Sequence, residues 1–463
     1  MSVKKKKGRI LLILSGTKVK RIRQELLLAA IVLTMAVGCS GAGRAASDSV
    51  SDADKTQSVR NRAEEVKSTD PETEQALETG SDIFKETDEE PGREYQTGIE
   101  KGYRLPLDEA AKKEAETDCR AAMEKISAIY RDADKGDALN PILSRDDISR
   151  MYTALQETGN PVIAAGCYYR MGNYEKMDAF LTDCRNGKAG GVTLYKINTG
   201  GGINRSRFMF DGGDMYVVDT AAAWNQDHQP NVTSSTHTRL KSWTYTPKGW
   251  FAYEYSVPEF PEVTEVVNGN YMVRVRPMAE EYINLAEEYL LPIGYQGNNL
   301  FRTNWDAGHM EGLDYNGLYE YLYEIRYQKA FGPQRNLDGI PREEFENIMT
   351  GYLPVSAADL LRYAVFDEEK QAYVWKRLGP LTHKANNFSS SIPEVVQTEE
   401  NPDGTISVFI DVVCMPRGDE ALMRHVVTLE LTDNGDVRFL ANQVTEEAKG
   451  EIAEYHYRLS EHP

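Results

Sequence analysis

The residues of this 463-residue chain that are suited to acid–base or metal chemistry are its histidines and carboxylates. No two of the seven histidines stand three or four positions apart, the spacing of paired metal ligands on a helix. The densest polar cluster is Asp306, His309 and Glu311. A histidine titrates near neutral pH, and a neighbouring carboxylate favours its protonated form, so this candidate polar site could share a proton or surround a metal. A surface loop between two helices explains the same residues, and we favour that interpretation.

A stripe of tyrosines is the second candidate. In a helix, a spacing of four places successive rings along one face. Such a face either offers an aromatic surface to a sugar or a partner, or packs between two parts of the protein, and we favour packing. The four residues are Tyr315, Tyr319, Tyr323 and Tyr327.

Sequence signatures of familiar catalytic sites are missing. There is no G-x-S-x-G elbow and no H-E-x-x-H pair. The glycines at 200–202 lack the Lys-Ser or Lys-Thr of a phosphate loop, and the acidic run at 132–137 has Asp137 where a calcium loop needs glycine. We therefore predict no cofactor and no metal, and enzymatic activity is the less favoured alternative.

The first 38 residues predict export. Their apolar run at 26–37 is shorter than the roughly 20 residues of a spanning helix, and many Lys and Arg precede it. The run ends at Ala36-Val37-Gly38-Cys39, which resembles the lipobox of bacterial lipoproteins. The resemblance implies that Cys39 is lipidated and becomes the mature N-terminus on the outer face of the cytoplasmic membrane. A cleaved secreted protein and an uncleaved anchor are the alternatives.

The charge balance restricts the partners. The formal net charge is −19, and removal of the basic leader makes it more negative. Such a surface repels nucleic acid and anionic lipid, so we expect no nucleic-acid binding. We expect attachment to the membrane through the N-terminal lipid.

The four cysteines after Cys39 contain no C-x-x-C pair, and buried free thiols are favoured over a disulfide. They are Cys119, Cys167, Cys184 and Cys414.

Composition and periodicity divide the chain into segments. Residues 39–104 predict an acidic, disordered tether. Helical periodicity followed by alternating strands predicts an antiparallel meander within 105–277, a helical connector at 278–336 and a C-terminal α+β domain at 337–463. The predicted fold class is α+β, with two helix-then-antiparallel-sheet units of cystatin-like or nuclear-transport-factor-like curvature.

Four segments resemble uncharacterised lipoproteins of clostridial-type Gram-positive bacteria: 289–306, 340–376, 401–414 and 425–442. The resemblance implies the same cellular location and supplies no catalytic residue. We expect a non-enzymatic binding or protein-interaction module at the cell surface, with an envelope protein or glycan as partner. The alternatives are a cell-envelope hydrolase that uses Asp306, His309 and His425, and a solute-binding lipoprotein. The last is disfavoured because strands follow strands here.

Overall fold

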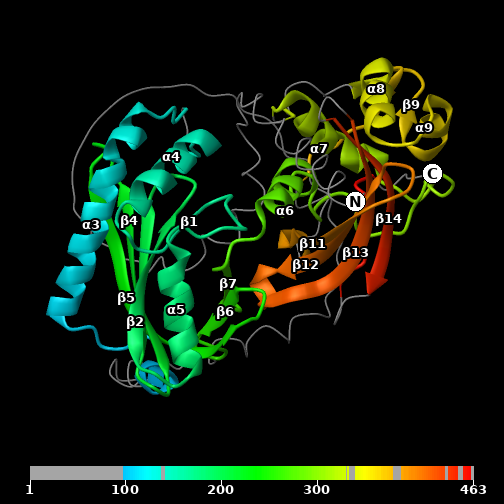
Figure 1. The fold of residues 1–463 in the computed structure, drawn as a ribbon. Helices are drawn as coiled ribbons and strands as arrows, with labels where there is room; N and C mark the ends of the chain where they lie inside the picture. The colour runs from blue at the N-terminus through cyan, green and yellow to red at the C-terminus, as the bar shows by residue number, and fades with distance from the viewer. Residues whose placement is uncertain are drawn as a thin grey trace, which may run out of the picture.

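The computed structural model describes residues 97–136, 141–329, 331–332, 339–378, 387–432, 436–446 and 452–459. It consists of two units side by side, each with helices packed on an antiparallel sheet (Figure 1). The predicted α+β class is confirmed. The predicted leader, Cys39 and residues 39–96 of the predicted tether lie outside the described residues.

The first unit is built on a seven-stranded sheet whose strands lie in chain order. Only β1 and β2 are parallel; the other neighbours pair antiparallel, as the alternating sequence predicts. The strands are β1 (Val162–Ala164), β2 (Gly190–Ile197), β3 (Ile203–Phe210), β4 (Met215–Trp224), β5 (Pro230–Tyr245), β6 (Trp250–Tyr255) and β7 (Asn270–Arg274).

Helices cover both faces of this sheet. The pair α3 (Glu109–Asp132) and α4 (Arg145–Gln156) packs on one face, around Met123 and Ile197. The other face holds α5 (Tyr174–Arg185), which packs on Leu194 and Phe208. A register shift in β5 bends the sheet, and β6 folds over the α5 face, so that the rings of Phe208 and Phe251 lie 5.4 Å apart.

The predicted tether extends too far along the chain. Residues 97–101 form a helical turn, and the backbone N–H of Arg239 donates to the carbonyl of Gly102 at 2.7 Å. Tyr103 is 5% exposed and hydrogen-bonds Glu262. Order therefore begins no later than Thr97. The sequence pattern missed this because one buried ring and backbone pairing to a distant strand leave no local periodicity.

The second unit joins the predicted connector and C-terminal domain around one hydrophobic core. Its helices are α6 (Glu280–Leu285), the π-helical turn η3 (Ala286–Leu290), α7 (Tyr315–Tyr327), α8 (Arg342–Tyr352) and α9 (Ala357–Tyr363), with 3-10 turns η5 (Asn387–Ser390) and η6 (Met415–Arg417). A small sheet contains β8 (Ile340–Pro341), β9 (Phe366–Asp367) and β10 (Ala372–Tyr373). The main sheet contains β11 (Ile392–Glu400), β12 (Ile406–Cys414), β13 (Asp419–Leu431) and β14 (Val437–Glu446).

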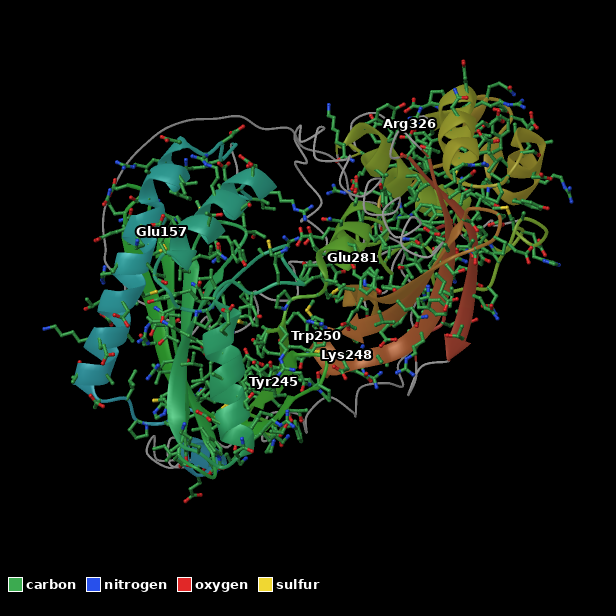
Figure 2. All side chains as sticks on the ribbon, viewed as in Figure 1. Glu157, Tyr245, Lys248, Trp250, Glu281 and Arg326 are labelled. Atoms are coloured by element: carbon green, nitrogen blue, oxygen red, sulfur yellow. The ribbon has the colours of Figure 1, made fainter. Side chains whose placement is uncertain are left out.

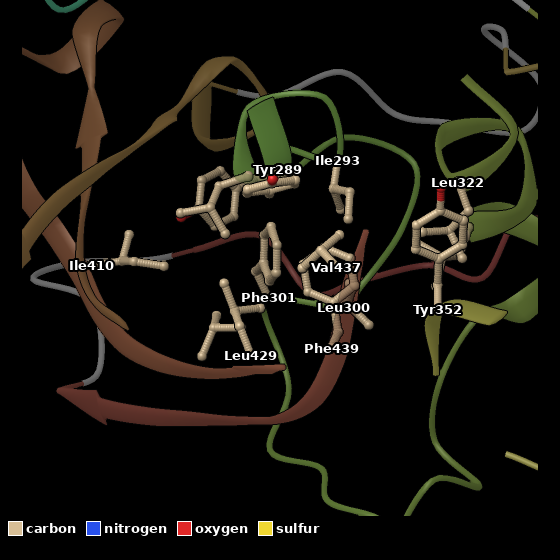
Figure 3. Packing of buried hydrophobic residues seen from close by; sticks show 14 of the residues in the cluster. Tyr289, Ile293, Leu300, Phe301, Leu322, Tyr352, Ile410, Leu429, Val437 and Phe439 are labelled. Carbon is tan, nitrogen blue, oxygen red and sulfur yellow. The ribbon is translucent and has the colours of Figure 1, made fainter. Parts of the chain in front are cut away.

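The core of the second unit lies between this main sheet and the chain that connects η3 to α7 (Figure 3). Phe301 is fully buried and contacts Phe439 of β14, with ring centroids 5.9 Å apart. Farther along, Leu322 of α7 and Tyr352 of α8 lie together. The connecting segment thus supplies core side chains although it has little regular structure.

A buried charged cluster joins the two units, where the β6 end of the first sheet meets β11 and β12 (Figure 2). Glu394 is 2% exposed and accepts hydrogen bonds from the Nε1 of Trp250 at 3.0 Å and from the Nζ of Lys248 at 3.1 Å. Arg274 pairs with the other oxygen of Glu394, and Lys248 also pairs with Asp411. A buried charge is tolerated when it is paired and hydrogen-bonded, so this cluster fixes the contact between the units.

In the part of the chain that the structure describes, no helix is both long enough and apolar enough to cross a membrane.

Candidate functional site

The predicted polar cluster lies on the surface. The carboxylate of Asp306 and the Nδ1 of His309 are 3.0 Å apart, and both side chains are mostly exposed. The backbone N–H of Gly308, and then His309, lower the pKa of the Asp306 carboxyl. Among the described residues, no hydrogen bond or ion pair joins Glu311 to either side chain. The structure therefore brings two of the three residues together, in an exposed turn that matches the favoured interpretation of a surface loop.

The tyrosine stripe is divided between core and surface. Tyr315 and Tyr319 are fully buried inside the second unit, where the ring of Tyr319 stacks on Phe345 at 5.2 Å. Tyr323 is 6% exposed and Tyr327 is 52% exposed. Packing inside one unit, and not between the two units, accounts for the first half of the stripe. An aromatic surface remains only at its C-terminal end.

His425, which the hydrolase alternative would use, is buried within the second core. Its Nδ1 lies 2.7 Å from the Oδ1 of Asn442, whose Nδ2 donates to the carbonyl of Thr303. Because Asn442 presents an acceptor, Nδ1 is the donor, and Nε2 accepts from the Tyr295 hydroxyl at 2.8 Å. Burial lowers the pKa of His425 to about 4. The imidazole is thus neutral, with both nitrogens hydrogen-bonded to neighbours in the core.

A second polar group lies inside the bend of the first sheet. The Nζ of Lys196 donates to the Tyr253 hydroxyl at 3.0 Å, and Tyr255 and Ser206 both donate to Asp219. Burial by itself would lower the pKa of Lys196, but Tyr253 and Asp219 raise it to about 12, so the side chain stays cationic. These side chains satisfy one another across β2, β3, β4 and β6, and we assign them to the stability of the sheet.

An open hollow lies where the end of α7 meets the start of α8. Its volume is about 610 Å³, within the range typical of small-ligand sites. Tyr327 of α7 and Glu343 of α8 are both exposed at it. Aromatic rings in a hollow can stack on a ligand, and carboxylates beside them can attract a positive charge on it. The described lining residues are Tyr323, Tyr327, Pro341, Glu343, Glu344 and Asn347.

Sequence reasoning missed the α8 half of this hollow. The run from Pro341 to Glu344 reads as a helix start, with proline and acids in their usual places, and the structure confirms that role. Nothing local indicates that Tyr327 lies opposite. The two halves meet because Tyr319 of α7 donates its hydroxyl to the Oε1 of Glu344 at 2.9 Å and thereby aligns the helices.

The cysteines contribute no described site. Cys119, Cys184 and Cys414 are buried and Cys167 is partly buried, and none of the four forms a disulfide. Burial raises the pKa of the Cys119 thiol to about 11. No group of three or more metal-ligating side chains converges anywhere in the described ranges.

Comparison with known proteins gives one match. The model of a family of unknown function, DUF6070, covers residues 112–458, about three quarters of the chain. The chain belongs to this family. The match begins inside α3 and ends at Arg458, so it includes both units, the junction at Glu394 and the α7–α8 hollow. No curated protein and no solved structure matches the chain.

Proposed function

We propose that this member of the family is a lipid-anchored, extracytoplasmic binding protein that engages a ligand or an envelope partner through the α7–α8 hollow, without catalysis. The leader and the lipobox-like run ending at Cys39 support the location. The acidic surface supports attachment through the lipid and not through anionic head groups.

The observation that carries the binding role is the exposed aromatic ring at a concave, acidic surface. Tyr327 is half exposed beside Tyr323, and their ring centroids are 4.5 Å apart. Large aromatic rings are usually buried, and those left at a hollow are typical contact residues of binding sites. The Asp306–His309 turn and the buried His425 are not among the described residues that line the hollow. The described lining instead offers aromatic rings, carboxylates and an amide, which are groups suited to binding.

Fractionation of cells tests the anchor. The Cys39→Ala variant should move from the membrane fraction to the soluble fraction, because it lacks the thiol that carries the lipid, whereas the Ser40→Ala control should stay with the membrane. Cys39→Ala protein that is still extracted only by detergent would indicate an uncleaved helix.

Photocrosslinking tests the hollow. A p-benzoylphenylalanine group in place of Tyr327, in cells that carry the anchored protein, should give a discrete light-dependent adduct. Wild-type soluble protein should compete it away, and the Tyr327→Ala variant should not. The same group in place of Glu369, an exposed residue outside the hollow, is the matched control. Identical adducts at both positions, or none at Tyr327, would refute the binding role.

A further inference from the structure

The α7–α8 hollow has a marked charge asymmetry. Glu343 and Glu344 stand in the first turn of α8, and no Lys or Arg is among the described residues that line the hollow. Neither carboxylate forms an ion pair with any residue that the structure describes. Glu344 accepts one hydrogen bond, from the hydroxyl of Tyr319. The start of α8 stabilises both acids through its backbone N–H groups but brings no side-chain cation.

Two basic residues that are close along the chain, Arg342 and Arg326, have other partners. The Nε of Arg342 donates to Glu346 at 2.8 Å, and its guanidinium lies 5.9 Å from the ring centroid of Phe366. Arg326 lies beside the hydroxyl of Tyr352. The two acids at the hollow therefore create a negative potential at a surface that already belongs to an acidic protein.

Two rings complete the geometry. The planes of Tyr323 and Tyr327 are tilted by 51° and form two adjacent walls. A ring face carries negative charge density and attracts an organic cation within about 6 Å, and nearby carboxylates add to that attraction. Anionic ligands are repelled, and a neutral ligand gains nothing from the two acids. The combination of ring faces with carboxylates selects a cation that has an apolar surface.

We propose that the α7–α8 hollow binds an alkylammonium group, held against the rings of Tyr323 and Tyr327 with Glu343 and Glu344 as counter-charges. This inference rests on the proposed binding role of the hollow and adds the ligand class. The group is available from two sources, a small quaternary or primary amine and the lysine side chain of a peptide. Both present the same positively charged, partly apolar head.

The test uses the full chain, purified in detergent, and two probes of the same shape. Choline carries the positive charge, and 3,3-dimethyl-1-butanol replaces its nitrogen by carbon. Calorimetry at low salt should show choline or N-acetyl-lysine amide binding at least ~10-fold more tightly than the neutral probe, which corresponds to about 1.4 kcal/mol. Stronger binding of choline would indicate a quaternary amine, and stronger binding of the lysine derivative a peptide.

Matched variants locate the binding. Tyr327→Ala should weaken it at least ~5-fold and Tyr327→Phe should keep it within ~2-fold, because the ring and not the hydroxyl faces the cation. Glu343→Gln should weaken binding, and the exposed Glu369→Gln control should not. Equal effects of the two glutamine variants, equal affinity for charged and neutral probes, or no binding of either ammonium compound would overturn the proposal. An adduct at Tyr327 without ammonium binding would leave the binding role intact and reject only the ligand class.

Discussion

The buried His425 should make the second unit lose stability in mild acid. In the folded protein its pKa is about 4, because burial disfavours the charged ring, whereas its usual value is 6.5. As the pH falls below 6.5, His425 therefore binds a proton in the unfolded chain but stays neutral in the folded chain. The stability is complete above pH 6.5 and is lost progressively toward pH 4.

The size of the effect follows from the two pKa values. Between pH 7.5 and pH 4.5 the differential protonation of His425 should lower the free energy of unfolding by about 2.5 kcal/mol, since one pKa unit corresponds to about 1.4 kcal/mol. Burial lowers the pKa of the ring, and the hydrogen bond to Asn442 offsets part of this effect. Asn442 accepts from Nδ1, and the Tyr295 hydroxyl donates to Nε2. Protonation of Nε2 would place a positive charge inside the core and would require the Tyr295 hydroxyl to turn from donor to acceptor.

Two measurements test this reasoning. Histidine carbon NMR, with the resonance assigned through the His425→Gln variant, should show one ring that stays neutral down to about pH 4. Denaturant unfolding at the two pH values should then differ more for the wild type than for His425→Gln, because carboxylate titrations are common to both proteins. A His425 resonance that titrates near 6.5, or equal pH dependence of the two proteins, would refute the assigned network.

Three further outcomes are expected. Glu394→Ala leaves Lys248 and Arg274 without a shared counter-charge at the junction and should lower the free energy of unfolding by about 3 kcal/mol, against less than ~0.5 for the exposed Glu400→Ala in the same denaturant titration. Burial raises the pKa of Glu324 to about 7, so its cost to stability grows as the pH rises from 4.5 to 7. Glu324→Gln should therefore stabilise the protein by about 3 kcal/mol at pH 8 and by little at pH 4, and equal effects would contradict this. A chain that begins at residue 105 lacks the buried Tyr103 ring, so its free energy of unfolding should be about 2 kcal/mol lower than that of a chain that begins at residue 97, and its Tm should be lower. Equal Tm values would support a tether that extends to residue 104.

Much of the fold was predictable because its signals are local. Helix α3 begins at Glu109, and Asp108 caps it by accepting from the N–H of Ala111. The turn at 211–214 joins β3 and β4, where Asp211 accepts from two backbone N–H groups. Period and capping depend on neighbours within a few residues, so the sequence alone determined the elements and the α+β class.

What covers each face was decided only by the tertiary structure. A spacing of four drifts by about 40° per step, so Tyr327 lies about 120° around α7 from Tyr315. Tyr315 is fully buried and Tyr327 is half exposed. Tyr363 of α9 stacks on Tyr315 and Phe345 of α8 stacks on Tyr319, whereas Tyr327 lies at the open hollow. A periodic pattern defines a face, whereas burial depends on which distant segment packs against it.

The candidate site has the same origin. The spacing of four identified the tyrosines as candidate site residues. Glu343 and Glu344, in contrast, indicated only the start of a helix. Likewise, nothing near Lys248 indicates that Glu394 will meet it across the junction. The sequence by itself determined the elements and the predicted export signal; the tertiary structure alone determined the hollow and the junction, because both are made of side chains that are far apart along the chain and become neighbours only when the elements pack.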